Sequence, residues 1–528
     1  MAQVELIEPH GLAGTGSLRP RAVVGAMAQL GGLQVILAIS GLVRNKVAAV
    51  YLKTSGMGEW AQILAIATTV FTIVQFGMVV GLSRNIAAAK DRQERQRQLS
   101  VANTLTIVLA VAAIVSTLVL SIFPAHQRIL QHLGVSVLQV NVVLVLICTL
   151  APIEGLRNNF LSFLQGALDI RGVATKRGIA VVVATIAAIP LVRCFGIAGA
   201  CIQFALASIL LALLLGNRCH ELGYKPLSFA WDNSSARSLT MLGGATLIAT
   251  FSYGVVDVVN RSQLIRWSGL AEAGVYQAGY LLSSQVTQIV LGSIGVVSLA
   301  AISRSVEPAV IAQKLKTMYE VVLPVSAIGL GVLGLLARPA LHILFSSQFA
   351  SSARFLPALL IANSLQAACW VAGAPLLGYG WIKTWLAMQL LDALLRIGAV
   401  ALLLPLIGAQ AIPVAFLLGQ LFLLLICVTV CSGWMHIGTS RAELGRIGLS
   451  AMIPGFVALI SVQPSLGRIC VGVCSLVIAG VVLVPRHLSR SAAANMGFAL
   501  RCCIQFRTSS LWQSGVRDHG WNRTKARE

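Results

Sequence analysis

The sequence contains no Gly-Lys dipeptide, and its longest polar breaks, near 84–99, 157–172, 217–238 and 303–317, are short. A Walker loop that cradles phosphates needs that dipeptide, so nothing indicates that the chain itself hydrolyses ATP. None of the breaks is long enough to hold a catalytic domain outside a membrane. We therefore expect a protein that is not an enzyme and that has no cofactor and no bound metal.

Acidic residues are also few, with 17 Asp and Glu against 39 Lys and Arg, which gives a net charge of +22. Such a balance can indicate nucleic-acid binding. The basic residues, however, lie mainly in alternate breaks, with about 20 on one side and about 10 on the other, as the positive-inside rule describes. We therefore expect no nucleic-acid partner and place both termini in the cytoplasm. Residues 1–21 are polar, so we expect no secretory signal among them.

What the chain has instead is apolar length, with 57% hydrophobic residues and a mean hydropathy of +0.85. From Ala22 to Val484, apolar stretches of about 20 residues follow one another, and that is the length a helix needs to cross about 30 Å of hydrocarbon. The sequence therefore predicts an all-α, multi-pass membrane protein with about fourteen spans.

A weak internal repeat divides these spans. Gly58 aligns with Gly274, Trp60 with Tyr276, and the pair at 44–45 with the pair at 260–261, all at one offset. A repeat of about six spans predicts two six-helix lobes related by an axis along the membrane normal, facing each other across a central cavity.

This repeat defines the expected organisation. It consists of a cytoplasmic N-terminal tail (1–21), an N-lobe of spans 1–6 (22–216), a cytoplasmic linker between the lobes (217–238), a C-lobe of spans 7–12 (239–432), two extra C-terminal spans (433–485) and a basic cytoplasmic tail (486–528).

Several short segments carry a resemblance to a known family. They are 42–49 (LVRNKVAA) with 55–58 (SGMG), 81–87 (GLSRNIA), 165–172 (QGALDIRG), and 344–349 (LFSSQF) with Ala374, Pro375 and Gly378. Over residues 20–432 the chain resembles the Wzx-type flippases of bacterial O-antigen and exopolysaccharide assembly, which belong to the multidrug/oligosaccharidyl-lipid/polysaccharide (MOP) exporter superfamily. The apolar segments after residue 449 depart from the usual twelve-span form of that family.

The resemblance implies a MATE-like fold of about 12 core helices, here with about 2 extra helices at the C-terminus. It implies a transporter of the bacterial inner membrane that moves an undecaprenyl-diphosphate-linked oligosaccharide to the periplasmic leaflet by alternating access. The lipid-linked oligosaccharide, the membrane lipids and the polysaccharide polymerase or chain-length machinery are the partners that it implies.

Three basic residues are candidates for binding the substrate diphosphate. Arg44 and Lys46 lie at the outer end of span 1, and Arg261 lies at the equivalent end of span 7. The repeat predicts that they face one another across the cavity, where arginine offers a fork of donors and lysine a point charge. The alternative is that they extend to the outer headgroups.

Two pairs with i, i+4 spacing are candidates for ion coupling or for neutral ion pairs in the lumen: Asp257 with Arg261, and Asp392 with Arg396. Asp392 lies deeper in its span, so it is also a candidate proton or sodium site. Glu154 and Arg157 form a further close pair just after Pro152, and the expected break at 157–172 follows them.

Other functions remain as alternatives. A cation-coupled multidrug antiporter of the MATE type would be expected to line its cavity with carboxylates, whereas the charges expected near this cavity are mainly basic. A lipid II flippase of the same superfamily carries two extra spans and is a second alternative. A membrane polysaccharide polymerase would need a sizeable periplasmic loop with acidic or arginine-rich catalytic residues.

Overall fold

The computed structural model describes residues 20–123, 125–135, 139–302, 307–378, 381–461 and 466–483, and within them every regular element is a helix. Nine of their segments are long and apolar enough to cross a membrane. Four of these segments, of 40 to 56 residues, each contain two spans separated by a break at or near Lys53, Gly196, Gly269 or Gly408. The all-α membrane fold predicted from the sequence is confirmed.

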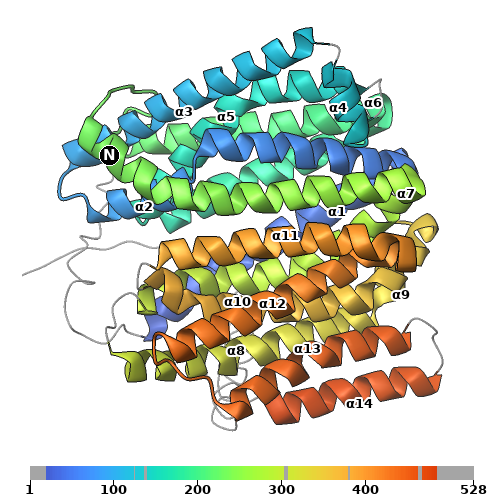
Figure 1. Cartoon of the computed structure of the whole chain (residues 1–528). Coiled ribbons are helices and arrows are strands. Elements are labelled where there is room, and N and C mark those ends of the chain that lie inside the picture. Colours follow the sequence, from blue (N-terminus) through green and yellow to red (C-terminus); the bar gives the residue numbers. More distant parts are fainter. Residues whose placement is uncertain are drawn as a thin grey trace, which may run out of the picture.

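Figure 1 shows two bundles of roughly parallel helices, one above the other in this view. The upper bundle is built from α2 (Met78–Ala88), α3 (Arg92–Ile122), α4 (Ala125–His132), α5 (Val140–Gly166) and α6 (Ile170–Glu221), with the second part of α1 (Pro20–Gln75). The first part of α7 (Asn233–Ile302) runs along this bundle. Its Ser262 bonds to Gln62 of α1 at 2.9 Å, and its Ser238 bonds to Asn85 of α2 at 3.2 Å.

The lower bundle contains α8 (Pro308–Leu335), α9 (Ala337–Leu344), η3 (Ser347–Phe355), α10 (Leu356–Gly378), α11 (Ile382–Ile407), η4 (Gly408–Gln410), α12 (Ala411–Gly433), α13 (Arg441–Ser461) and α14 (Leu466–Leu483). Helix α13 packs into the core of this bundle, because Ile447 and Ala451 lie in one apolar cluster with Leu323 of α8 and Ala368 of α10. Ala479 of α14 packs on a smaller cluster beside it.

The repeat seen in the sequence appears as a contact between its two copies. The backbone is left-handed inside α1 at Lys53 (φ 59°) and inside α7 at Gly269 (φ 84°), which are positions related by the repeat offset. A Cβ on Gly58 would lie 2.9 Å from the nitrogen of Gly274, and a Cβ on Gly274 would lie 3.0 Å from the nitrogen of Gly58. Equivalent residues therefore touch each other, as a pseudo-twofold axis between them requires.

The segment between α6 and α7 is held against α3. Asn103 donates to the carbonyl of Pro226 at 2.8 Å, and Gln96 donates to the carbonyl of Lys225 at 3.0 Å. Asp232 then caps α7 by accepting from the Ser235 amide at 2.9 Å. Hydrogen bonds from Ser235 and Ser234 lower the pKa of Asp232 to about 2. The connection between the two bundles is thus fixed to the upper one.

Candidate functional site

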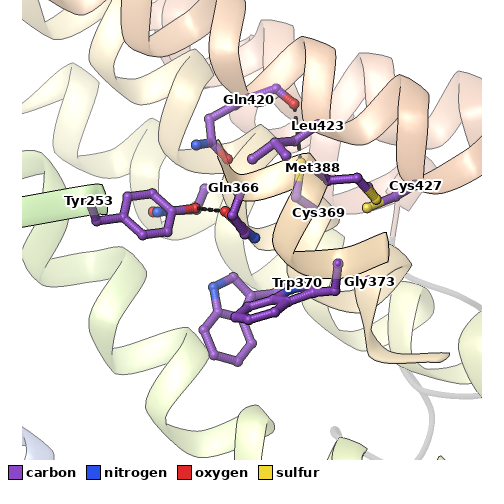
Figure 2. A pocket seen from close by; sticks show the side chains of 11 residues that line it. Tyr253, Gln366, Cys369, Trp370, Gly373, Met388, Gln420, Leu423 and Cys427 are labelled. Carbon is purple, nitrogen blue, oxygen red and sulfur yellow. Dashed lines mark hydrogen bonds between the residues drawn. The ribbon is translucent and has the colours of Figure 1, made fainter. Parts of the chain in front are cut away.

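A cavity of about 280 Å³ opens between α7, α10, α11 and α12. Figure 2 shows the side chains around it, with Tyr253 entering from α7 and Trp370 from α10. Its polar and aromatic lining consists of Tyr253, Gln366, Trp370, Trp385, Gln389 and Gln420. None of the residues that line it carries a formal charge.

The amides of this pocket are partly paired with the protein. The Tyr253 hydroxyl donates to Oε1 of Gln389 at 2.6 Å, and this bond ties α7 to α11. The Cys369 thiol donates to the backbone carbonyl of Gln420 at 3.2 Å. The side chain of Gln420 is only 1% exposed, and its Nε2 has no hydrogen-bond partner among the described residues. A buried donor without an acceptor costs about 1–3 kcal/mol, so this amide is suited to a ligand.

An ion pair lies on α11 one turn beyond the pocket lining. Arg396 Nη1 lies 3.8 Å from Asp392 Oδ2, and Asp392 is 1% exposed. The Arg396 guanidinium lies 4.9 Å from the ring centroid of Phe416 and 6.0 Å from that of Tyr253. Gly419 of α12 allows this close packing, because a Cβ there would meet Arg396 Cγ at 2.7 Å.

A second ion pair lies on α7. Arg261 bonds to both carboxylate oxygens of Asp257, through Nε at 3.1 Å and Nη2 at 3.0 Å, and its guanidinium lies 5.9 Å from the ring centroid of Tyr280. The Arg261 side chain is only 7% exposed, whereas that of Asp257 is 42% exposed. In this conformation the carboxylate is therefore the accessible member of the pair, and the arginine is its buried partner.

The other two residues of the predicted diphosphate site lie elsewhere. Arg44 is half-buried on α1, and its Nε has no partner among the described residues. The Lys46 amine approaches the backbone carbonyl of His342 at 3.5 Å, which is the limit of a hydrogen bond. No hydrogen bond or ion pair between described residues joins either of them to Arg261.

The upper bundle contains a polar cluster around Glu154 and Arg157, the pair that the sequence placed beside the expected break at 157–172. Helix α5 continues to Gly166 and α6 begins at Ile170, so the break between them covers only 167–169 of the expected 157–172, and Arg157 lies inside α5. Arg157 bonds to Glu154 at 2.7 Å, and Glu154 also accepts a hydrogen bond from the Ser208 hydroxyl of α6. The position of these charges was hidden because both ends of the turn are rich in polar residues.

Arg177 of α6 completes this cluster. It lies within electrostatic range of Arg157 and forms no hydrogen bond or ion pair with another described residue. It shares a face of α6 with the buried residues Val173, Ala180 and Ala184, and the first two of these pack in one cluster with residues of α5 and of the second part of α6. That spacing of i, i+3 and i+7 was the available sequence signal that Arg177 points into the bundle.

The family model described as "Polysaccharide biosynthesis protein" matches residues 27–306, more than half of the chain. The chain belongs to this family. The flippase family of the MOP superfamily that was predicted from the sequence is therefore confirmed. A comparison with curated proteins found no match.

Several solved structures share the fold. The lipid II flippase MurJ, in an inward closed conformation, is 13% identical with a TM-score of 0.67, over 86% of this chain and 97% of that one. An inward-facing multidrug resistance MATE family transporter of the MOP superfamily is 13% identical with a TM-score of 0.60, over 80% and 98%. A MOP superfamily transporter from Pyrococcus furiosus, whose title reports a reverse polarity of its binding pocket, is 14% identical with a TM-score of 0.53, over 80% and 98%.

Proposed function

We propose that this polysaccharide biosynthesis protein is a flippase for an undecaprenyl-diphosphate-linked oligosaccharide. It moves the headgroup from the cytoplasmic to the periplasmic leaflet of the bacterial inner membrane, with both termini in the cytoplasm, by rocking the two bundles about their contact. The product then passes to the polymerase or chain-length machinery. The family match and the shared fold with a lipid II flippase support this proposal.

The observation that carries the proposal is the presence of unneutralised arginines inside the helices. Arg44 of α1 and Arg177 of α6 have no carboxylate partner among the described residues. A charged side chain inside a membrane helix is costly, so it is usually paired or lines a pathway that serves a function. A diphosphate headgroup supplies the missing negative charge, and an arginine fork can bind it through two parallel hydrogen bonds.

Lys46 and Arg261 remain in the proposed diphosphate site together with Arg44. For Arg261 the proposal requires an exchange of partners, because its guanidinium is held by Asp257. Asp392 stays the candidate coupling site, with Arg396 as the cation that leaves it when a proton or sodium ion binds. Substrate binding would then open the ion pair of α7, and ion binding would open the ion pair of α11.

The experiment is complementation of a flippase-null host, with surface polysaccharide measured at matched protein levels. We expect Arg44→Ala and Arg177→Ala to abolish export, and Arg177→Lys to recover part of it because lysine keeps the charge without the bidentate fork. Arg193→Ala is the matched control, because Arg193 also lies on α6 but is exposed. Wild-type export from both alanine variants would overturn the proposal.

Arg261 has its own test in the same host. If its guanidinium binds the diphosphate, Arg261→Ala should abolish export and Asp257→Asn, which weakens the competing pair, should not. If Arg261 serves only to neutralise Asp257, loss of the arginine leaves that carboxylate without its partner inside the helix bundle, and the double variant Asp257→Asn/Arg261→Ala should recover export. Recovery in the double variant would remove Arg261 from the site.

The fold similarity to MurJ favours lipid II as a second candidate substrate. Rescue of cells depleted of their lipid II flippase, without rescue of polysaccharide export, would identify it.

A further inference from the structure

The pocket between α7, α10, α11 and α12 differs in chemistry from the arginines of the proposed diphosphate site. Its lining combines three side-chain amides, one phenol and two indoles, and it carries no formal charge. An amide both donates and accepts hydrogen bonds, as does a hydroxyl group. The lining is therefore suited to a ligand that is uncharged and has several hydroxyl or amide groups.

The aromatic residues add flat apolar walls to this polar set. Trp370 is more than half exposed on α10, and Figure 2 shows its indole below the amides of the pocket. Trp385 of α11 also lines the cavity. A sugar ring presents hydroxyl groups around its edge and C–H groups on its faces, so it can bond to amides while its face packs on an indole.

The size of the pocket limits the ligand to a small ring. Small-molecule pockets usually measure about 300–1,000 Å³, and this cavity, at about 280 Å³, lies just below that range. An acyl or polyprenyl chain fits poorly, because it would leave Gln366 and Gln420 without partners. A whole oligosaccharide exceeds the cavity, but one of its rings does not.

The neighbouring charges argue against a cationic ligand. The acid closest along α11 is Asp392, and it already faces Arg396, whose guanidinium lies near the rings of both Phe416 and Tyr253. Arg396 thus presents positive charge on the side of Tyr253, which lines the pocket. A lipophilic cation would find two indoles here but no free carboxylate.

We propose that this pocket binds one uncharged sugar ring of the substrate headgroup, with Gln420 and Gln389 bonding to its hydroxyl or acetamido groups and Trp370 packing on its face. This inference rests on the proposed function and assigns the recognition of the sugar to the lower bundle. The Gln420 amide has the free donor for this contact, and Gln389 is already oriented by the Tyr253 hydroxyl.

The test measures binding of methyl glycosides of neutral hexoses and N-acetylhexosamines to the purified full-length protein, by saturation-transfer difference NMR. We expect at least one glycoside to bind, and its affinity to fall at least tenfold in Gln420→Leu and in Trp370→Leu. Trp434→Leu is the matched control, because Trp434 is also an exposed indole but packs on Trp381 outside the pocket. The affinity of Trp434→Leu for the glycoside should equal that of the wild type.

Three results would overturn the inference: no glycoside binds the wild type, both pocket variants bind as the wild type does, or tetraphenylphosphonium displaces the glycoside. Misfolding of one variant is recognised by size-exclusion chromatography, and the other variant then decides. The outcome is separable from the proposed function. Glycoside binding that depends on Trp370, together with failed complementation, would retain the pocket and refute the flippase assignment, whereas the reverse pattern would retain the flippase and refute the pocket.

Discussion

The contact between Gly58 and Gly274 predicts how a single methyl group would change the conformational balance of the protein. These glycines belong to different bundles, and each packs on the backbone just after the break that precedes the other. A Cβ on Gly58 would also collide with the carbonyl oxygen of Leu270, and a Cβ on Gly274 would collide with that of Thr54. Neither obstacle is a side chain that could rotate away, so the two backbones would have to separate.

The size of the effect follows from the distances. The new Cβ would lie 2.9 Å from the Gly274 nitrogen, whereas ordinary van der Waals contact begins at 3.4 Å. Overpacking of this kind costs about 1–3 kcal/mol. Because the clash exists only while the two segments touch, Gly58→Ala should shift the equilibrium away from this closed arrangement by about 5–150-fold.

Distances between spin labels measure this shift. The labels replace Arg193 and Leu406, which are both exposed. These positions lie near the same end of the two bundles, since Val192 packs with Leu52 and Leu404 packs with Leu264. In a background without the native cysteines, the population with the longer distance should increase in Gly58→Ala. Gly244→Ala is the control, because no atom lies within 4 Å of the Cβ it adds. An unchanged distance distribution in Gly58→Ala, with normal stability, would refute the idea that the Gly58–Gly274 contact holds the closed arrangement.

Three further predictions concern other sites. Gly419→Ala should lower the melting temperature, because its Cβ would crowd Arg396 and Asp392 at a cost of about 1–3 kcal/mol. The control Gly398→Ala on α11 should leave the melting temperature unchanged, because open space surrounds the Cβ that it adds. The Asp232 pKa of about 2 lies below its ordinary value of 3.8, so the cap of α7 is fully present above pH 4 and weakens toward pH 2. Hydrogen exchange, corrected for intrinsic rates, measures the free energy of opening of the first turn of α7. This free energy should fall over that pH range in the wild type and stay constant in Asp232→Asn. Truncation after Gly433 should destabilise the protein, measured by thermal unfolding in detergent, because it removes α13 from the core of the lower bundle.

The periodic and symmetric features of the chain were predictable from the sequence because they depend on length and composition. Apolar stretches of membrane length define the helices, and the repeat offset relates Gly58 to Gly274 before any contact is known. The sequence did not indicate that these two glycines touch each other. That contact depends on the relative placement of two distant helices, which a single sequence does not encode locally.

The candidate site was less predictable, because the environment of a charge depends on its neighbours in space. Spacing alone related Asp257 to Arg261, but only packing on Tyr280 makes the arginine the buried member. Arg177 follows a polar stretch of the sequence, which hides the fact that α6 carries it into the bundle. The amide pocket left no motif, since its glutamines come from three different helices.

The two bundles share one architecture but differ in the charge of their interiors. In the upper bundle Arg157 pairs with Glu154, and Arg177 beside it has no carboxylate partner among the described residues, so this cluster keeps an excess positive charge. On α7 Asp257 faces Arg261, and on α11 of the lower bundle Asp392 faces Arg396, which leaves a neutral pocket beside the lower-bundle pair. A headgroup with an anionic diphosphate and an uncharged sugar ring would therefore contact both bundles with different parts. A ligand that bridges the bundles favours the conformation in which its two contacts form together. Such a ligand would change how often the contact between Gly58 and Gly274 opens.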